Sequence, residues 1–497
     1  MTDGARYLAV DIGASGGRAF VGEFDGDRLR TTAASRFANR SVRLPDGLRW
    51  DALGLYAGVL DSIGAASAER PLDSIGIDTW AVDFGLLDAT GALIGNPRHH
   101  RDARNEDSVA TLLEAVPAAE IYATTGNQFL PINTLCQLLA LRGTPELEGA
   151  ATLLLIPDLL TYWLTGEIAS EATNASTTQM LDARRGTWAV ELIERLGLRP
   201  EILTRVVEPG TAAGTLRGTV AADLGLEAEI GVTRVASHDT ASAVVAVPAE
   251  AVDFAYISSG TWSLVGVERP EPLLDAAAAG ENLTNERGFA GTTRLLKNVM
   301  GLWLLQQLEA ELGVTQERLV AEAEGAESGP LFDPDLPELL APGPIAERIL
   351  TAIERAGGAV PGSRGELVRG VLESLACKYR FALEQIEGVS GARPGRIHVV
   401  GGGCRNRLLC ALTADVCHRP VLAGPAEATA IGNLMVQAHA AAEVGSLTEI
   451  RAVVRRSVEV ERHEPGRDRD DLYGRFLEAL AASSADAAAL VGEGVAR

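Results

Sequence analysis

The chain of 497 residues is 46% hydrophobic and 22% charged, and its formal net charge is −23. Because one hydrophobic core does not serve so long a chain, we expect two to three domains, and the apolar content excludes a chain that is mainly disordered. The acidic balance argues against nucleic-acid or anionic-membrane partners, which need a basic surface, and no apolar run approaches the ~18 residues of a membrane-spanning helix.

The first predicted element is a hairpin at residues 7–24, YLAVDIGASGGRAFVGEF, in which two apolar strands flank a turn of Gly, Ala and Ser. Such a turn exposes backbone N–H groups with little side-chain bulk, as the close approach of a phosphate chain requires. The same design returns at residues 252–268, VDFAYISSGTWSLVGVE. Two copies of one hairpin predict two related domains, 1–246 and 247–497, with a nucleotide held in a cleft between them.

Strands and helices alternate between the two hairpins. Residues 74–87 read as a strand pair, residues 106–146 as helix with a break at FLPINT, and residues 151–166 as a strand that runs into a helix. Residues 231–247 read as a strand, a polar turn and a small apolar helix. This alternation predicts an α/β fold.

The second half of the chain continues the alternation. LKNVMGLWLLQQL reads as an apolar helix in which Gly301 indicates close packing or ligand approach, and residues 314–345 read as a loop or a peripheral excursion. A core helix is expected at about 365–387, and residues 396–416 read as a strand, three glycines and a helix. A nucleotide can approach the backbone at these glycines without meeting a Cβ. Beyond residue 443 we expect a short strand and a final helix.

Residue usage excludes several kinds of site. The two lysines, Lys297 and Lys378, do not stand in a GxxxxGK[ST] loop or a VAIK strand, which excludes a P-loop NTPase and a protein kinase. The five cysteines are scattered without a CxxC motif, so we expect neither a disulfide framework nor a zinc site, and we expect a cytoplasmic location. Because the chain is strongly acidic, a phosphate ligand must be bound by local donors and a metal ion.

Asp239 in SHDTAS is the candidate catalytic residue, since a carboxylate at a strand end can accept the proton of an attacking hydroxyl group. The alternative is that Ser237, Asp239 or Thr240 only caps the following helix. Asp11 precedes the first glycine turn, where Mg²⁺ would reconcile its charge with that of a phosphate; a solvated Asp at a strand end is the alternative. Arg18 follows this turn and could balance phosphate charge, or it could lie on the surface.

A polar set in the first half of the chain is suited to a sugar ligand. Carboxylates and guanidinium groups can read hydroxyl positions, and the ring of Trp80 can lie against the sugar. The set contains Asp78, Asp83, Arg101, Asp102 and Arg104. For the segment HRDAR, a charged loop with internal ion pairs is the alternative.

Eight motifs occur in the order and spacing of the FGGY carbohydrate kinases, which the chain resembles from about residue 7 to about residue 440: DIGASGGR, DTWAVDF, HRDAR, FLPINT, ASHDTASAV, SSGTWSL, LKNVMGLWLLQ and VVGGGCRN. The resemblance implies two actin-like (ribonuclease H-like) domains with the active site in the cleft between them. It implies a kinase that uses ATP and Mg²⁺ to phosphorylate L-rhamnulose at its 1-hydroxyl group in L-rhamnose catabolism, as a monomer or homodimer.

Residue by residue, the resemblance implies that Asp239 is the proton acceptor. It also implies contacts with the sugar. Together with residues of the polar set, the expected sugar-binding residues are Ala81, Asp83, Arg101, His238, Asp239, Thr240 and Asn298. It implies ATP contacts at Ala14, Ser15, Gly16, Gly17, Arg18, Thr261, Gln306, Gly402 and Gly403. The metal ligand expected from the residues themselves is Asp11.

Two residues depart from the family pattern. Ala81 stands where related sequences have Gly, so a backbone contact with the sugar must tolerate a methyl group, and Gly17 replaces a residue that is usually Ser. Another ketose, such as L-fuculose or xylulose, is therefore an alternative substrate. An actin- or chaperone-like ATPase switch is an alternative of another class, although such a switch has no evident use for the polar set.

Overall fold

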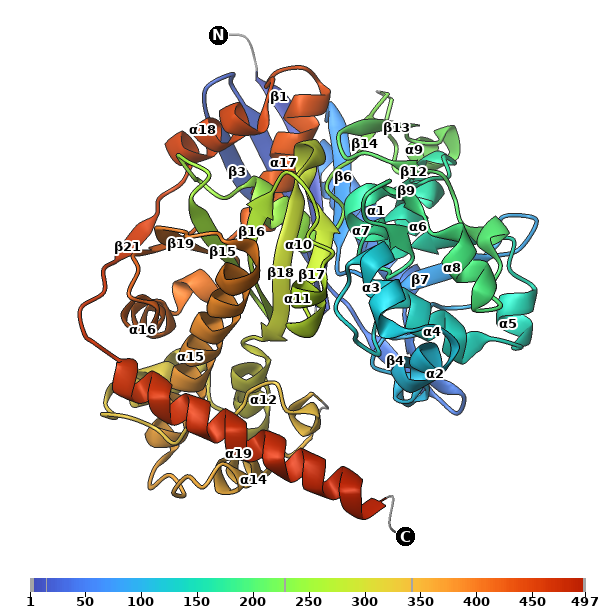
Figure 1. The fold of residues 1–497 in the computed structure, drawn as a ribbon. Helices are drawn as coiled ribbons and strands as arrows, with labels where there is room; N and C mark the ends of the chain where they lie inside the picture. Colours follow the sequence, from blue (N-terminus) through green and yellow to red (C-terminus); the bar gives the residue numbers. More distant parts are fainter. Residues whose placement is uncertain (1–3, 15, 228, 341–342, 495–497) are drawn as a thin grey trace. The chain divides into compact units, whose positions relative to one another are not determined.

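The computed structural model describes residues 4–14, 16–227, 229–340 and 343–494, and the chain divides into two compact units (Figure 1). Unit 1 comprises Met1–Val252, Glu268–Leu296 and Glu427–Val458. Unit 2 comprises Asp253–Val267, Lys297–Ala426 and Glu459–Arg497. Each unit thus combines segments that are far apart in the sequence, and the division into 1–246 and 247–497 stays a prediction.

Unit 1 is built on a six-stranded sheet in the order β13-β14-β6-β1-β2-β3. β1, β2 and β3 pair antiparallel, which confirms the first predicted hairpin, whereas β6 pairs parallel with β1 and β14 pairs parallel with β6. The strands are β1 Ala5–Gly13, β2 Gly16–Phe24, β3 Leu29–Ala38, β6 Ser74–Thr79, β13 Thr211–Thr215 and β14 Gly231–Arg234.

Helices α1, α6 and α17 pack on this sheet, and α10 packs on α17. A Cβ on Gly432 of α17 would lie 1.8 Å from the carbonyl oxygen of Ser242 in α10, so only glycine allows this close helix crossing. The α-helices of unit 1 are α1 Ala52–Ser67, α2 Ser108–Ala115, α3 Ala118–Thr125, α4 Thr134–Leu141, α5 Pro145–Glu148, α6 Ile156–Thr165, α7 Ala172–Ala175, α8 Val190–Arg195, α9 Gly218–Asp223, α10 Asp239–Val245, α11 Ala276–Gly280, α17 Ala428–Ala440 and α18 Leu447–Ser457.

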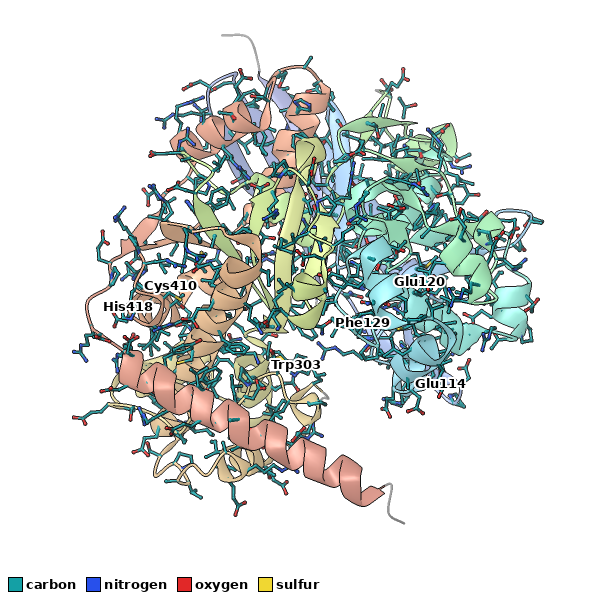
Figure 2. The ribbon with its side chains drawn as sticks, viewed as in Figure 1. Glu114, Glu120, Phe129, Trp303, Cys410 and His418 are labelled. Atoms are coloured by element: carbon teal, nitrogen blue, oxygen red, sulfur yellow. The ribbon has the colours of Figure 1, made fainter. Side chains whose placement is uncertain are left out.

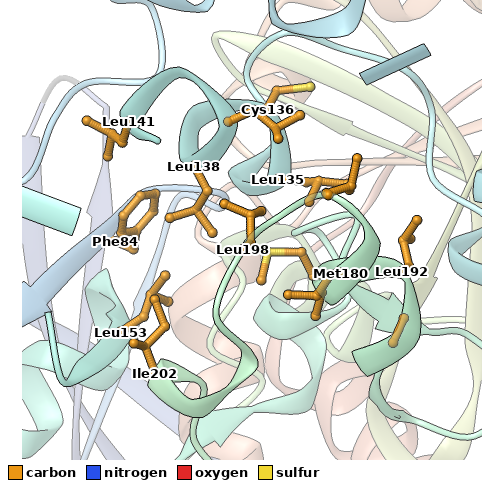
Figure 3. Close-up of a cluster of buried hydrophobic side chains, with 14 of the residues drawn as sticks. Phe84, Leu135, Cys136, Leu138, Leu141, Leu153, Met180, Leu192, Leu198 and Ile202 are labelled. Carbon is orange, nitrogen blue, oxygen red and sulfur yellow. The ribbon is translucent and has the colours of Figure 1, made fainter. Parts of the chain in front are cut away.

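A second hydrophobic core of unit 1 lies beside β7 and β8 and includes Phe84, Leu138 and Leu153 (Figure 3). Both strands of the predicted pair at 74–87 exist, but β7 pairs with β8 and not with β6, so the predicted pairing was wrong. The short strands of unit 1 are β4 Ser41–Leu44, β5 Gly47–Trp50, β7 Phe84–Leu87, β8 Thr152–Leu155, β9 Ser170–Glu171, β10 Leu181–Asp182, β11 Thr187–Trp188, β12 Val206–Val207 and β17 Thr284–Arg287, and its 3₁₀ helices are η1 Ala103–Asn105, η2 Pro200–Ile202 and η3 Phe289–Gly291.

Unit 2 repeats the strand pattern of unit 1. β15 pairs antiparallel with β16 and parallel with β19, which in turn pairs parallel with β20, so the second predicted hairpin is confirmed. Two of the five boundaries between the units fall within strands, one in β16 and one in β18. The strands are β15 Phe254–Ser259, β16 Trp262–Arg269, β18 Thr293–Met300, β19 Arg396–Val400, β20 Val421–Ala423 and β21 Glu461–His463.

The longest helix of the described chain, α15, begins where the Ser363 side chain accepts a hydrogen bond from the N–H of Glu366, and it ends at Gly391 with φ of 69°. Ser and Gly are favoured at these two positions because they satisfy terminal backbone groups. The α-helices of unit 2 are α12 Trp303–Leu312, α13 Gln316–Glu324, α14 Ile345–Arg355, α15 Arg364–Ser390, α16 Arg407–Cys417 and α19 Asp470–Gly494, and its 3₁₀ helices are η4 Pro337–Leu339 and η5 Gly402–Arg405.

Two predictions for the second half of the chain were wrong. Residues 293–300 form strand β18, and the expected helix begins only at Trp303, which is labelled in Figure 2. A short apolar run fits a buried strand as well as a helix, so its composition did not distinguish them. The expected loop at 314–345 contains helix α13. In the described residues, no helix is both long and apolar enough to cross a membrane.

Candidate active site

Two buried carboxylates stand on adjacent strands of unit 1. Asp11 lies on β1 and Asp78 on β6, and the parallel register pairs these two residues directly. They are 5% and 0% exposed. Paired residues project from the same face of a sheet, so the two acids lie together. From the sequence we placed Asp78 in the polar set that is suited to a sugar. The strand register instead places it beside Asp11, the candidate metal ligand.

Arg18, on the other side of Asp11 in β2, is the cation of this cluster. Its guanidinium donates to Asp11 Oδ2 at 2.7 Å and to Glu427 Oε2 at 2.5 Å. Asn433 of α17 donates to Asp78 Oδ2 at 2.6 Å. Sequence reasoning missed Glu427 and Asn433, because they follow the other residues by more than 300 positions and stand in no motif that we singled out.

Asp11, Asp78, Asp239 and Glu427, which we call the acid cluster, carry more negative charge than Arg18 neutralises. Burial, together with the charges of Asp239 and Glu427 and against the lowering effect of Arg18, raises the pKa of Asp11 to about 6. Burial, together with the charge of Asp11, also raises the pKa of Asp78. In the described part of the chain, Asp78 Oδ1 has no hydrogen-bond partner. A buried oxygen of this kind is suited to a cation.

Asp239 is the first residue of α10, and His238 occupies the N-cap position without a side-chain capping bond. Asp239 is therefore not the N-cap residue of this helix, which was the alternative interpretation. Its Oδ1 accepts a hydrogen bond from the backbone N–H of Thr240 at 2.5 Å. The Asp239 side chain is 31% exposed. His238 also forms an isolated bridge with Thr79, the residue after Asp78, so Asp239 follows the strand end near the acid cluster.

A buried glutamate fixes the turn before α10. Glu171, which is 0% exposed, accepts hydrogen bonds from the Ser237 N–H at 3.0 Å and from the Ser237 hydroxyl at 2.7 Å. The same carboxylate accepts from the Thr173 N–H at 2.8 Å. These bonds connect α7 to the segment that leads into Asp239, so the position of the candidate base is set by several elements. Glu171 stands in no motif that we singled out.

The first glycine turn joins β1 to β2. Ala14 is exposed in this turn, Gly16 and Gly17 begin β2, and Ser15 lies outside the described residues. A Cβ on Gly17 would lie 2.1 Å from Cζ of Phe37. The ring of Phe37 thus occupies the space that the side chain of a serine would need, which explains the glycine at this position.

The loop that carries Ala81 has strained backbone. Val82 adopts φ of 69°, a conformation that is unfavourable for a β-branched residue. Its carbonyl oxygen accepts from the Thr134 hydroxyl at 2.7 Å, and the N–H of Asp83 bonds to the Ala81 carbonyl at 2.9 Å. Strain of this kind persists where surrounding contacts impose it and is typical of functional loops.

Asp83 is held by aromatic side chains. Its Oδ2 accepts from the indole N–H groups of Trp50 at 2.6 Å and of Trp80 at 2.8 Å, and it lies 2.7 Å from His100 Nδ1. Gln137 donates to Oδ1 at 3.1 Å. Asp83, which is 1% exposed, therefore fixes the rings around the Ala81 loop. Its own role as a sugar ligand stays a prediction.

The segment HRDAR has the internal ion pair of the alternative interpretation. Asp102 caps η1, and its Oδ1 accepts from Arg104 Nε at 2.9 Å. Burial would raise the pKa of Asp102, but the bonds from Arg104 and from the Leu48 N–H lower it to about 2. Arg101 is half-buried, and its proposed sugar contact stays a prediction.

In unit 2, the second turn brings two predicted ATP contacts together. The Thr261 hydroxyl lies 3.3 Å from Gln306 Oε1, within hydrogen-bond distance. Gly301 connects β18 to α12, and a Cβ there would lie 2.5 Å from the carbonyl carbon of Trp262 and 2.6 Å from the Gly260 carbonyl oxygen. The expected close approach at Gly301 is thus confirmed, outside a helix, and it positions α12 against the turn.

The glycines after β19 approach the same hairpin. A Cβ on Gly403 would lie 2.0 Å from Ser259 Oγ, whereas nothing lies within 4 Å of the Cβ position of Gly402. Gly403 therefore serves packing, and the Gly402 backbone is open to a ligand. Asn298, on β18, is half-buried.

The fold, together with the candidate residues of unit 1 and unit 2, defines a carbohydrate kinase. Residues 6–246 match the N-terminal domain of the FGGY family of carbohydrate kinases, and residues 255–441 match its C-terminal domain. The chain belongs to this family, and its two-domain α/β fold is the actin-like fold that we expected.

Among curated proteins, the chain is similar to the rhamnulokinase of Bacteroides thetaiotaomicron, with 40% identity over 92% of this chain and 96% of the relative. It is 39% identical to the rhamnulokinase of Pectobacterium carotovorum, over 97% of each chain. Among solved structures, it resembles a ligand-bound xylulose kinase from Lactobacillus acidophilus (TM-score 0.79, 17% identity, 98% of each chain). It also resembles the ADP complex of glycerol kinase from Plasmodium falciparum (TM-score 0.77, 17% identity, 97% of this chain and 99% of that one).

Proposed function

We propose that this kinase transfers the γ-phosphoryl group of ATP to the 1-hydroxyl group of L-rhamnulose, giving L-rhamnulose 1-phosphate and ADP. The proposal rests on the convergence of Asp239, at the start of α10, with the buried pair Asp11 and Asp78. The choice of sugar rests on rhamnulokinases that are 39–40% identical over most of the chain.

Asp239 is the group suited to accept the proton of the sugar hydroxyl. It combines partial exposure with a carboxylate whose Oδ1 is already oriented by the N–H of Thr240. As the hydroxyl oxygen attacks the γ-phosphorus and the bond to the β-phosphate oxygen breaks, the hydroxyl proton passes to Asp239. The reaction is a direct in-line transfer without a phosphoenzyme.

The acid cluster fits Mg²⁺, which prefers one or two carboxylates together with phosphate oxygens. Asp11 and Asp78 would hold the ion directly or through water, and the clearest sign of such a role is that Asp78 Oδ1 has no hydrogen-bond partner among the residues that the structure describes. Burial raises the pKa of both acids although Arg18 opposes the rise, and a divalent charge would favour both carboxylate forms. When bound, Mg²⁺ supplies positive charge to the phosphate oxygens.

The remaining donors serve the nucleotide and the sugar. In unit 2, the side chains of Thr261, in the second turn, and Gln306, in α12, lie within hydrogen-bond distance, and the Gly402 backbone is open. In unit 1, the glycine turn after Asp11 offers backbone N–H groups, and the strained loop at Ala81 serves the sugar. Transfer requires the donors of both units to act on one triphosphate. Exclusion of water from that complex would prevent ATP hydrolysis.

Stoichiometric ADP release on addition of L-rhamnulose tests the function, with L-fuculose and L-xylulose as alternative acceptors compared by kcat/KM. Asp239→Asn should lower kcat by roughly 10²-fold or more, the usual contribution of a general base. Asp61→Asn, at an exposed position of α1, is the matched control and should keep full activity. Full activity of a folded Asp239→Asn protein would contradict the assigned base, and ATP hydrolysis indifferent to every sugar would contradict the kinase function.

A further inference from the structure

A buried ion pair stands behind His238 and takes no part in the chemistry described above. Glu286 on β17 and Arg294 on β18 are register partners, and they are 4% and 0% exposed. Arg294 Nη2 lies 2.9 Å from Glu286 Oε2 and 3.2 Å from Nδ1 of His238. His238, itself 5% exposed, thus connects this pair to the start of α10.

The other ring nitrogen of His238 faces the candidate base. Nε2 of His238 lies 3.3 Å from Oδ1 of Asp239. This oxygen also lies within hydrogen-bond distance of the Thr240 hydroxyl, at 3.2 Å, and accepts from the Thr240 N–H. The contacts of the Asp239 carboxylate in the described residues therefore fall on Oδ1, which leaves Oδ2 for the acceptor hydroxyl group.

The chemistry of arginine selects one form of His238. A guanidinium only donates hydrogen bonds, so Arg294 can bond to Nδ1 only if that nitrogen carries no proton. A neutral imidazole then carries its proton on Nε2, where the N–H faces Asp239 Oδ1. Glu286, whose Oε2 lies 3.3 Å from Nδ1, would favour a proton on Nδ1 if it acted alone. Arg294, which lies 3.2 Å from Nδ1, opposes a proton on that nitrogen.

We propose that the Glu286–Arg294 pair is a positioning device for the catalytic base: it holds His238 with its proton on Nε2, and that N–H fixes Oδ1 of Asp239. The inference rests on the proposed function, since it takes Asp239 as the base. Glu286 keeps the buried guanidinium neutralised and oriented, because a buried charge without a partner would be unstable. Neither residue of the pair needs to touch the substrate.

The test compares Glu286→Gln and Arg294→Lys with the parent protein. Glu286→Gln keeps the shape of the side chain but removes the charge that orients Arg294, and Arg294→Lys keeps the positive charge but loses the planar donor group. We expect kcat to fall roughly 10- to 100-fold, the worth of one hydrogen bond to a charged group, with little change in KM for ATP. Arg294→Lys should lose less activity than Arg294→Met.

Nitrogen NMR of protein labelled at its seven histidines reads the tautomer directly. A His238→Asn protein identifies the signal, which should report a proton on Nε2 in the parent and a changed state in both pair variants. Glu373→Gln, which breaks the buried pair of Glu373 with Arg369 in unit 2, is the matched control and should alter neither the signal nor kcat.

A parent His238 signal with its proton on Nδ1, or pair variants that keep the parent's signal and kcat, would overturn the proposal. The NMR measurement needs no sugar. If the parent phosphorylates none of the ketoses but shows the Nε2 tautomer, the proposed function fails while the positioning of His238 stands.

Discussion

Replacing Gly17 by Ala should destabilise unit 1 by about 1–3 kcal/mol, the usual cost of overpacking a close-packed site. The new Cβ would lie 2.1 Å from Cζ and 2.3 Å from Cε2 of Phe37, so the ring must move by at least about 1.3 Å to reach ordinary van der Waals contact. The ring cannot retreat freely, because it also lies against Gly58 of α1, whose Cβ position is 2.5 Å from Cδ2. Gly17 begins the strand that follows the phosphate turn, and we therefore expect KM for ATP to rise as well.

Urea unfolding of Gly17→Ala, Phe37→Leu and the double variant measures this clash. A smaller residue at position 37 gives the new methyl group space, so the double variant should be more stable than the sum of the single effects by about 1 kcal/mol or more. Gly64→Ala, in the interior of α1 with only Leu224 near its Cβ position, is the control and should be neutral or stabilising. Additive effects within about 0.5 kcal/mol would refute the idea that Phe37 dictates the glycine.

Gly301→Ala should raise KM for ATP and lower stability by about 1–3 kcal/mol, because its Cβ would meet backbone atoms of Trp262 that cannot rotate away. Gly388→Ala, at an open helical position, is the control that should not weaken ATP binding. Without divalent cations, the stability of the parent relative to Asp11→Asn should fall as the pH rises from about 4 to about 6. Burial raises the pKa of Asp11 from 3.8 to about 6, so the folded chain keeps a proton that the unfolded chain has lost. Mg²⁺ should reduce the difference in stability between the parent and Asp11→Asn near neutral pH. If the stability of the parent relative to Asp11→Asn instead rises with pH, the pKa of Asp11 is not raised.

The sequence predicted the elements whose causes are local. Both hairpins were expected, because two apolar strands joined by a glycine turn place every determinant within about twenty residues. The helix after β8 was expected from Pro157 in its first turn and Gly166 at its end, where φ is 91°. Asp239 was placed correctly at the start of a helix for the same reason: the strand, the polar turn and the apolar run are consecutive.

Long-range packing decides what the sequence did not predict. Asn433 reaches Asp78 because α17 packs on β6, where a Cβ on Gly76 would lie 2.4 Å from Asn433 Oδ1, and no spacing rule relates positions 78 and 433. The same limit hid Glu286 and Arg294, whose meaning depends on the strand register that brings them to His238. Family motifs identified residues that we expect to contact ligands, whereas these partners were found only through the fold.

The charge of the acid cluster favours a bound cation. The charges of Asp239 and Glu427 act on Asp11, those of Asp11 and Asp239 act on Asp78, and Arg18 is the cation that acts on both buried acids. These four carboxylates and one guanidinium give a formal charge of −3. Such an excess is unfavourable at low exposure, and protonation of Asp11 and Asp78 relieves part of it. A bound divalent cation would relieve it without removing the carboxylates, and binding would then stabilise the folded unit. The arrangement that lowers the stability of the free protein is therefore the one that favours a metal–nucleotide complex.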